Sequence, residues 1–473
     1  MLFCSIEFIF FFLPIFLLIY YMVPQRYSNL VLFLGSIFFY WYGEHRYFIL
    51  ILVSLAVHFI LTAVSEGKSR GVQRFCLILM LAYGFGSLFI FKYLGFFQTN
   101  WNHLAAWLAA NRGWTLPVLD MQVPDLPIGI SFYTFQIAAY AIDVYRGRIR
   151  REKSFVSLGA FLSMFPQLIA GPIVLYEQVA DRLKKRKLSW DRIEDGLKLF
   201  IIGLSLKMLL ANTFGILWNQ VQTWGVSAVS VPVLWLAVFA YTFQIYFDFQ
   251  GYSLMAMGLG EMLGFKIPRN FRHPYTAVSV TDFWRRWHIT LSGWFRDYVY
   301  IPLGGSRKGM LRTVFNMFIV WAFTGLWHGA SWNFVLWGLY YFVLLVLEKL
   351  FLGKILAHLP GIRWLYTFIA VSTGWVIFAV TDLHVLKEFL SGMYLSLGNM
   401  EAWRMGNGVF TDVIRQYGIF FLIGILFALP LPYAFYKKHK KNIITILVLL
   451  ALFIYSVYKM KTAASNPFLY FRF

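Results

Sequence analysis

Charged side chains are scarce in this chain of 473 residues. Asp, Glu, Lys and Arg make up 13% of it, whereas hydrophobic residues make up 60%. A soluble fold cannot bury so much apolar surface, so the composition predicts an integral membrane protein with many spans. Acidic residues are the scarcer charged class, 21 against 42 basic residues, which gives a formal net charge of +21. The basic residues gather in short loops between apolar runs, a pattern typical of cytoplasmic loops rather than of nucleic-acid binding.

Cysteine pairs and the motifs of soluble enzymes are also missing. The two cysteines, Cys4 and Cys76, lie far apart in apolar surroundings, which predicts neither a disulfide framework nor a metal site. The chain contains no Gly-x-Ser-x-Gly elbow, no His-Glu-x-x-His motif, no Walker loop and no dinucleotide fingerprint. We therefore expect no bound metal or cofactor and none of the common soluble hydrolase or nucleotide-binding chemistries.

Apolar runs long enough to cross or enter a bilayer recur along the whole chain. Several are too short for a full crossing, so we expect an all-α polytopic protein with roughly a dozen spans, forming a single domain over residues 1–473. The runs fall near 3–22, 29–43, 47–64, 75–97, 128–145, 155–176, 197–217, 231–247, 251–264, 313–327, 331–350, 364–381, 417–435 and 442–458.

Proline and glycine interrupt one of these runs at residues 164–172. Broken backbone at membrane depth survives only where protein or a water-filled cavity satisfies it, so the segment is either a re-entrant element or a Pro-kinked helix. The basic loops are expected on the cytoplasmic side, which places the tail from residue 459 outside. The expected location is a cytoplasmic membrane, which the chain crosses several times.

The segment 280–298 has the period of an amphipathic helix. Arg285, Arg286 and Arg296 fall off its apolar face, and His288 lies at the edge. We expect this helix at the inner interface or packed beneath the spans. The apolar face consists of Val280, Phe283, Trp284, Trp287, Leu291, Trp294, Phe295 and Tyr298.

His328 lies inside an apolar stretch from residue 313 to residue 350. An ionisable side chain at membrane depth marks a functional site by default. The runs 313–327 and 331–350 should form a hairpin, and His328, sixteen residues past Arg312, would lie roughly 24 Å from the inner surface. Burial disfavours an imidazolium, so the ring is expected to be neutral and suited to act as a general base; the alternative is a satisfied core histidine.

Further polar and aromatic residues are candidates for the lining of a substrate cavity. The three arginines of segment 280–298 are suited to lipid phosphates or to an anionic thioester donor. Asp248 either orients the cavity or pairs with a basic residue such as Arg286. The remaining candidates are Trp327, Trp287 and Asn333.

Three motifs carry a resemblance to a known family. They are DFWRRWHITLSGWFRDY at 282–298, YIPLGGSR at 300–307 and WHGASW at 327–332. The chain resembles the membrane-bound O-acyltransferases, and within them the bacterial branch typified by the alginate O-acetyltransferase membrane subunit. The resemblance implies a ring of tilted helices around a central tunnel, with His328 as the residue associated with acyl transfer and His288 as its partner.

The end of the chain, FLYFRF at 468–473, resembles the C-terminal motif of a small partner protein in teichoic-acid D-alanylation. In that system the motif's tyrosine is implicated as an acyl carrier, which points to Tyr470 as a covalent relay in the tail 459–473. The alternative for Tyr470 is an aromatic anchor at the membrane interface.

Together these features predict an acyltransferase that passes an acetyl group from a cytoplasmic donor, acetyl-CoA or another acyl thioester, to an extracellular or cell-wall polysaccharide. An extracytoplasmic SGNH/esterase-like O-acetyltransferase is the expected partner, and membrane lipids surround the chain. Two alternatives stay open: D-alanyl transfer to teichoic acids, and a transporter or flippase for a polysaccharide intermediate.

Overall fold

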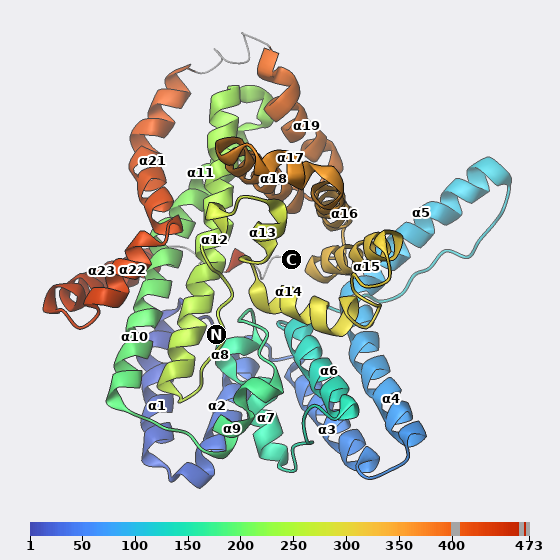
Figure 1. Ribbon diagram of the computed structural model, residues 1–473, viewed down its shortest axis with the longest axis vertical. Coiled ribbons are helices and arrows are strands. Elements are labelled where there is room, and N and C mark those ends of the chain that lie inside the picture. Colours follow the sequence, from blue (N-terminus) through green and yellow to red (C-terminus); the bar gives the residue numbers. More distant parts are fainter. Residues whose placement is uncertain (399–406, 463–467, 470–473) are drawn as a thin grey trace.

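The computed structural model describes residues 1–398, 407–462 and 468–469. Within these residues the chain is helical and contains no β-strand, as the all-α prediction requires (Figure 1). The first half comprises α1 (Leu13–Met22), α2 (Ser28–Gly43), α3 (Phe48–Ser65), α4 (Arg70–Leu88), α5 (Leu94–Arg112), α6 (Ile130–Arg146), α7 (Phe155–Ser163), α8 (Phe165–Leu168), α9 (Tyr176–Lys184), α10 (Trp190–Ser205), α11 (Asn212–Trp224) and α12 (Val231–Met262). The second half comprises α13 (Val280–Trp284), α14 (Ile289–Phe295), α15 (Met310–His328), α16 (Trp332–Leu347), α17 (Gly353–Ala357), α18 (Pro360–Ala379), α19 (Leu383–Tyr394), α21 (Asn407–Ala428), α22 (Leu431–His439) and α23 (Ile443–Thr462).

Nine helices in the described part of the chain are long and apolar enough to cross a membrane, which makes this a multi-pass membrane protein. The expected number was roughly a dozen. One reason for the difference is that the runs 231–247 and 251–264 form the single 32-residue helix α12. Another is that the run 128–145 forms α6, which at 17 residues is slightly shorter than a full span.

Helix α12 runs through the middle of the molecule, with α10 packed along it (Figure 1). Glycines allow this close approach: a Cβ on Gly203 would collide with the carbonyl oxygen of Gly251, and one on Gly258 with that of Gly196. Small residues at such spacing let two membrane helices approach backbone to backbone. Helices α10 and α12 therefore form a closely packed central pair.

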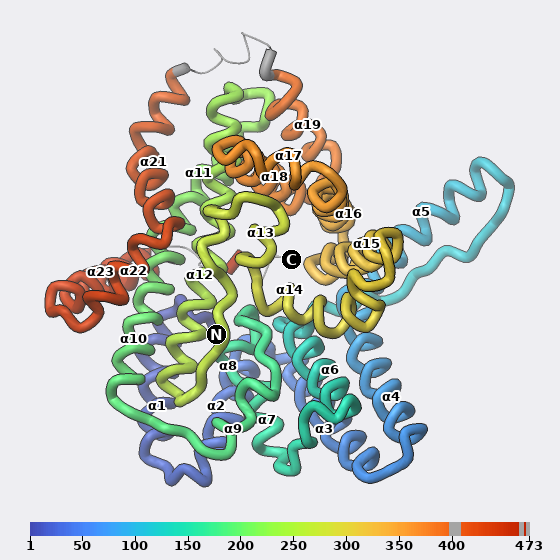
Figure 2. Tube along the Cα trace, viewed as in Figure 1, coloured from blue at the N-terminus to red at the C-terminus, as the bar shows by residue number. Residues whose placement is uncertain are grey.

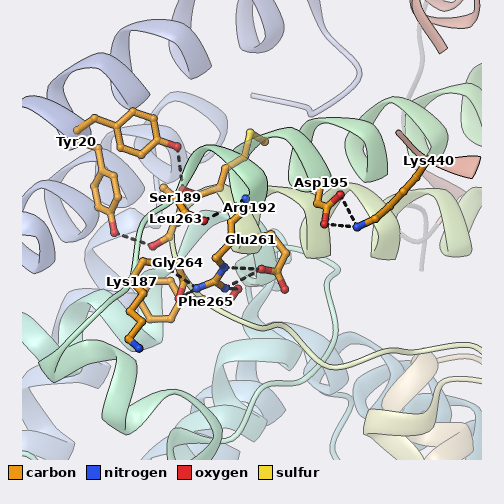
Figure 3. Close-up of polar contacts among 12 residues, drawn as sticks. Tyr20, Lys187, Ser189, Arg192, Asp195, Glu261, Leu263, Gly264, Phe265 and Lys440 are labelled. Carbon is orange, nitrogen blue, oxygen red and sulfur yellow. Dashed lines mark hydrogen bonds and ion pairs between the residues drawn. The ribbon is translucent and has the colours of Figure 1, made fainter. Parts of the chain in front are cut away.

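Polar contacts join α10 and α12 at one end of this pair (Figure 3). Arg192 of α10 donates to the carboxylate of Glu261 on α12 at 2.7 and 2.9 Å and also reaches the carbonyl of Gly264. Beside it, Lys440 approaches the Asp195 carboxylate at 2.6 Å, which ties the turn before α23 to α10.

The interrupted segment 164–172 is a broken helix and not a continuous kinked one. Helix α7 ends at Ser163, α8 covers one turn, and non-helical backbone continues to α9. Residues 158–174 are all buried. Side chains satisfy part of this backbone: the N–H of Phe165 donates to Ser36 Oγ at 3.2 Å, and that of Ile173 donates to Thr290 Oγ1 at 3.0 Å. This arrangement agrees with the re-entrant alternative.

Both terminal segments reach the interior at α12. The N-terminus lies in the middle of the view in Figure 2, and the ring of Phe3 stacks on Tyr252 of α12 at 4.9 Å between centroids. The ring of Phe468 contacts the same tyrosine at 4.6 Å, and its side chain is buried. Phe468 therefore lies in the helix core.

Candidate active site

The hairpin of α15 and α16 carries His328 into the core, as the sequence predicted. His328 is the last residue of α15, and Gly329 continues in extended backbone toward α16. A Cβ on Gly329 would collide with the ring of Phe334. The glycine after the histidine is thus required for space, because the Phe334 ring closes the turn.

Aromatic rings surround the imidazole of His328, whose residue is 6% exposed. The ring centroids of Trp327, Trp337 and Phe378 lie 5.0, 4.9 and 5.2 Å from that of the imidazole, all in edge-on geometry. These rings come from α15, α16 and α18, so three helices fix the orientation of the imidazole.

The segment 280–298 is not the single amphipathic helix that its period predicted. It forms α13 and α14, separated at His288, which has a positive φ of 42°. At this break, backbone groups near Asn270 replace the hydrogen bonds that a continuous helix would make. The N–H of Ile289 donates to the Asn270 carbonyl at 3.0 Å, and the N–H of Arg272 donates to the Arg286 carbonyl at 2.9 Å. The apolar face was predicted correctly, since its members are buried except the half-buried Trp284.

The hydrogen bonds of Asn270 fix the tautomer of His288. Oδ1 of Asn270 accepts from the hydroxyl of Thr290 at 2.7 Å and from its N–H at 3.3 Å, which identifies this atom as the amide oxygen. Nδ1 of His288 lies 3.2 Å from the same oxygen and must therefore carry the proton. Burial lowers the pKa of His288 to about 3, so the ring is neutral and Nε2 holds the lone pair.

One indole joins the two histidines. The ring centroid of Trp327 lies 5.9 Å from that of the His288 imidazole and 5.0 Å from that of the His328 imidazole. Two imidazoles forty residues apart in the sequence thus meet the same side chain inside the protein.

A cavity of about 80 Å³ reaches His328. Its wall includes Lys92, which the sequence analysis missed. The ammonium of Lys92 donates to the carbonyl of Trp327 at 2.5 Å and lies 3.3 Å from Ser131 Oγ. A lone lysine in the apolar run 75–97 was the signal that could have identified it. The cavity is lined by Lys92, Leu126, Pro127, Ile128, Gly129, Ile130, Ser131, Phe132, Ile169, Trp327 and His328.

The arginine candidates do not line this cavity. Arg285 is exposed, and Arg286 bonds Asp282 at 2.9 Å and Thr276 at 3.0 Å. Arg296 pairs with its neighbour Asp297 and is largely exposed. These positions leave Arg285 and Arg296 accessible to an anionic headgroup or donor.

Trp287 and Asn333 are buried and have structural contacts. Trp287 packs on Trp375 at 4.7 Å between ring centroids. Asn333 donates from Nδ2 to the carbonyl of Phe378 at 2.9 Å and so joins α16 to α18. Both support the walls around His328.

The expected pairing of Asp248 with a basic residue is confirmed, but the partner is Lys207 and not Arg286, which pairs with Asp282. Asp248 forms a buried ion pair with Lys207, which lies on a π-helical turn, Leu206–Ala211, beside α12. The other carboxylate oxygen, Oδ2, accepts from the N–H of Leu469 at 2.9 Å. Asp248 therefore holds the backbone of Leu469 in the core. Tyr470, the next residue, lies outside the described residues.

Comparison with known proteins identifies the family of the chain. The model of MBOAT, the membrane-bound O-acyltransferase family, matches residues 37–386. A probable alginate O-acetylase of Pseudomonas putida is 34% identical over 100% of both chains. The peptidoglycan O-acetyltransferase of Helicobacter pylori is 35% identical over 82% of this chain and 78% of that protein. The teichoic acid D-alanyltransferase of Bacillus subtilis is 28% identical over 54% of this chain and 69% of that protein.

The range matched by the family model includes the positions of both histidines. The chain belongs to the membrane-bound O-acyltransferase family and is an integral membrane acyltransferase.

Proposed function

We propose that this protein moves an acetyl group from a cytoplasmic thioester donor, acetyl-CoA, through the membrane for O-acetylation of an extracellular or cell-wall polysaccharide. The observation that carries the proposal is the pair of buried imidazoles on Trp327, one of which lines a small cavity. A neutral imidazole in a water-poor site is suited to accept a proton from a hydroxyl nucleophile.

The proposed reaction exchanges a thioester for an oxygen ester. His328 takes the proton of the acceptor hydroxyl while its oxygen attacks the thioester carbonyl. A C–O bond forms, the C–S bond breaks, and the proton passes to the leaving sulfur. Since the products are an ester and a thiol, proton transfer and positioning supply most of the catalysis.

His288 has the geometry of a donor-side assistant. Its Nδ1–H points at Asn270, which puts the lone pair of the ring on Nε2. This lone pair is suited to receive a hydrogen bond from the thiol or hydroxyl of a substrate. His288 therefore orients a substrate while His328 moves its proton.

The position of Phe468 and Leu469 supports Tyr470 as the acyl carrier. Leu469 is held by Asp248, and Phe468 is buried against Tyr252. A tyrosine directly after these anchors would be the first acceptor, and the acetyl group would then pass to an extracytoplasmic SGNH/esterase-like partner. That partner would complete delivery to the sugar hydroxyls. The transferase itself would lie in a bacterial cytoplasmic membrane.

Replacement of Tyr470 by Phe tests this function in cells. The phenol is lost while the aromatic ring stays, so ester-linked acetate on the surface polymer should fall to background while the amount of polymer is unchanged. Tyr458→Phe, an exposed tyrosine of α23, is the matched control. Loss of the polymer itself would favour a flippase, and ester-linked D-alanine in place of acetate would favour D-alanyl transfer.

A further inference from the structure

A second cavity, of about 880 Å³, lies among α3, α4, α6 and α9. These helices lie together in the lower part of the view in Figure 1. Among the described residues, none lines both this cavity and the one that reaches His328. The volume falls within the roughly 300–1,000 Å³ of pockets that enclose small molecules. The cavity therefore has room for a ligand that takes no part in acyl transfer.

This cavity lies where membrane-spanning helices end. Helix α3 ends at Ser65 and α4 begins at Arg70, and both belong to candidate spans. The loop that follows α6 lines the cavity with residues 149–153 and carries the basic residues expected at the inner membrane surface. In the predicted orientation, the cavity thus lies at the level of the lipid headgroups of the inner leaflet.

Hydrogen bonds and an ion pair hold part of the cavity wall in place. Nε of Arg151 lies 2.6 Å from Oε2 of Glu66, the residue that follows α3. The carboxylate of Glu152 accepts from the Tyr176 hydroxyl of α9 at 2.5 Å and from the N–H of Ser154 at 2.8 Å. These contacts join the loop after α6 to the end of α3 and to α9, and they give the charges of Arg151, Glu66 and Glu152 partners within the wall.

Five other charged side chains line the cavity and form no ion pair with a described residue: the basic Arg150, Lys153 and Lys184, and the acidic Glu177 and Asp181. All five are exposed. Glu177 and Asp181 lie four residues apart on α9, so their carboxylates share one face of the helix and repel each other. A cation bound between them would relieve this repulsion. The cavity thus presents charges of both signs that do not neutralise one another.

Apolar side chains complete the lining. Met80 of α4 and Ala141 of α6 are 3% and 0% exposed, and Val144, Ile149 and Ala180 are half-buried. A ligand that fits this lining carries a positive charge, a negative charge and an apolar part. A phospholipid with a zwitterionic headgroup combines these three features.

We propose that this cavity binds the headgroup of a phosphatidylethanolamine, with the phosphate at Arg150 and Lys153 and the ammonium between Glu177 and Asp181. Arg and Lys side chains donate strong hydrogen bonds to phosphate oxygens. A primary ammonium offers three N–H donors to the two carboxylates, whereas the trimethylammonium of phosphatidylcholine offers none. The glycerol headgroup of phosphatidylglycerol carries no cation. This lipid site goes beyond the proposed acyl transfer and does not depend on it.

The test compares lipids that share their acyl chains and differ only in the headgroup. Dioleoyl phosphatidylethanolamine, phosphatidylcholine or phosphatidylglycerol would be added to the delipidated full chain in detergent, and native mass spectrometry would give the dissociation constant of each lipid. Wild-type protein should bind phosphatidylethanolamine at least fivefold more tightly than either of the others. Soluble glycerophosphoethanolamine offers the same headgroup without acyl chains and should bind at least tenfold more weakly, because it leaves the apolar lining without a partner.

Two pairs of substitutions separate the two halves of the headgroup. Glu177→Gln with Asp181→Asn removes the carboxylates, so the affinity for phosphatidylethanolamine should fall to within twofold of that for phosphatidylcholine.

Arg150→Gln with Lys153→Gln removes the partners of the phosphate, which both lipids carry, so both affinities should fall at least fivefold. Glu388→Gln and Lys437→Gln, at exposed residues of α19 and α22, are the matched controls and should change neither affinity. All these positions are exposed, so the variants should fold, and their unfolding temperatures without added lipid check this.

Three results would overturn the inference. Equal affinities of wild-type protein for phosphatidylethanolamine and phosphatidylcholine would show that the ammonium is not recognised. A preference that survives the loss of both carboxylates would place the lipid elsewhere on the molecule. Glycerophosphoethanolamine that binds as tightly as the lipid would assign the cavity to a soluble compound with this headgroup.

Discussion

The side-chain oxygen of Asn270 lies 3.2 Å from Nδ1 of His288 and fixes which ring nitrogen carries the proton. Because Thr290 donates twice to the same oxygen, the amide cannot turn its NH₂ group toward the imidazole without losing both bonds. Asn270 is thus a positioning residue that acts through His288.

Replacement of Asn270 tests this role. In Asn270→Ala the ring loses its fixed tautomer, so kcat should fall at least tenfold with little change in KM for the thioester. In Asn270→Asp a carboxylate would face Nδ1 and stabilise the imidazolium, so the pKa of His288 would rise from about 3. As the pH is lowered, the rate of acyl transfer would therefore begin to fall at a higher pH than in wild type. A merely structural role would lower protein abundance without moving the pH profile.

The burial of His288 makes stability depend on pH. Its pKa is about 3 in the folded chain and ordinarily about 6.5, so between these values the unfolded chain binds a proton that the folded chain excludes. Stability should therefore fall as pH drops from 6.5 toward 3, by up to about 1.4 kcal/mol per pH unit from this group. Thermal unfolding in detergent should show a flatter pH dependence for His288→Gln. Identical slopes in both proteins would contradict the assignment.

The turn after His328 depends on the space at Gly329. The added methyl group of Gly329→Ala would overlap the Phe334 ring, and overpacking of this kind costs about 1–3 kcal/mol. We expect a lower unfolding temperature and reduced acyl transfer. The double variant Gly329→Ala with Phe334→Leu should recover stability, because the smaller side chain makes room. Failure of this rescue would mean that Gly329 has another role.

The stability of the fold should also depend on the ion pair of Lys207 and Asp248. Both side chains are about 5% exposed, so removal of one partner leaves a buried charge and should cost about 3–5 kcal/mol. Asp248→Asn should lower the unfolding temperature and loosen the tail. The double variant with Lys207→Met should be more stable than Asp248→Asn alone. Additive losses in the double variant would argue against a direct pairing.

The sequence predicted the features that depend on local pattern. Apolar runs indicated a polytopic all-α protein, the motif around His328 indicated a hairpin, and the period of segment 280–298 identified the buried face. These predictions hold because burial follows from periodicity even where the helix breaks.

Features that depend on distant partners could not be predicted. The break at His288 arises from backbone pairing with the segment near Asn270, and helical period carries no information about such a partner. Asp248 was expected to pair with a basic residue such as Arg286, whereas the fold presents Lys207 from the π-helical turn that follows α10. Lys92 is another residue whose role the sequence could not predict. A single lysine in an apolar run is unusual, but only the fold shows that it lies beside His328.

The most direct test of the central claim is the rate of thiol release from acetyl-CoA by the purified full chain with and without the imidazole of His328. The account predicts that His328→Ala loses at least 10²-fold in rate, within the roughly 10²–10⁴-fold range of general-base catalysis, while His358→Ala, an exposed histidine, matches wild type. A folded His328→Ala protein that releases thiol at the wild-type rate would contradict it.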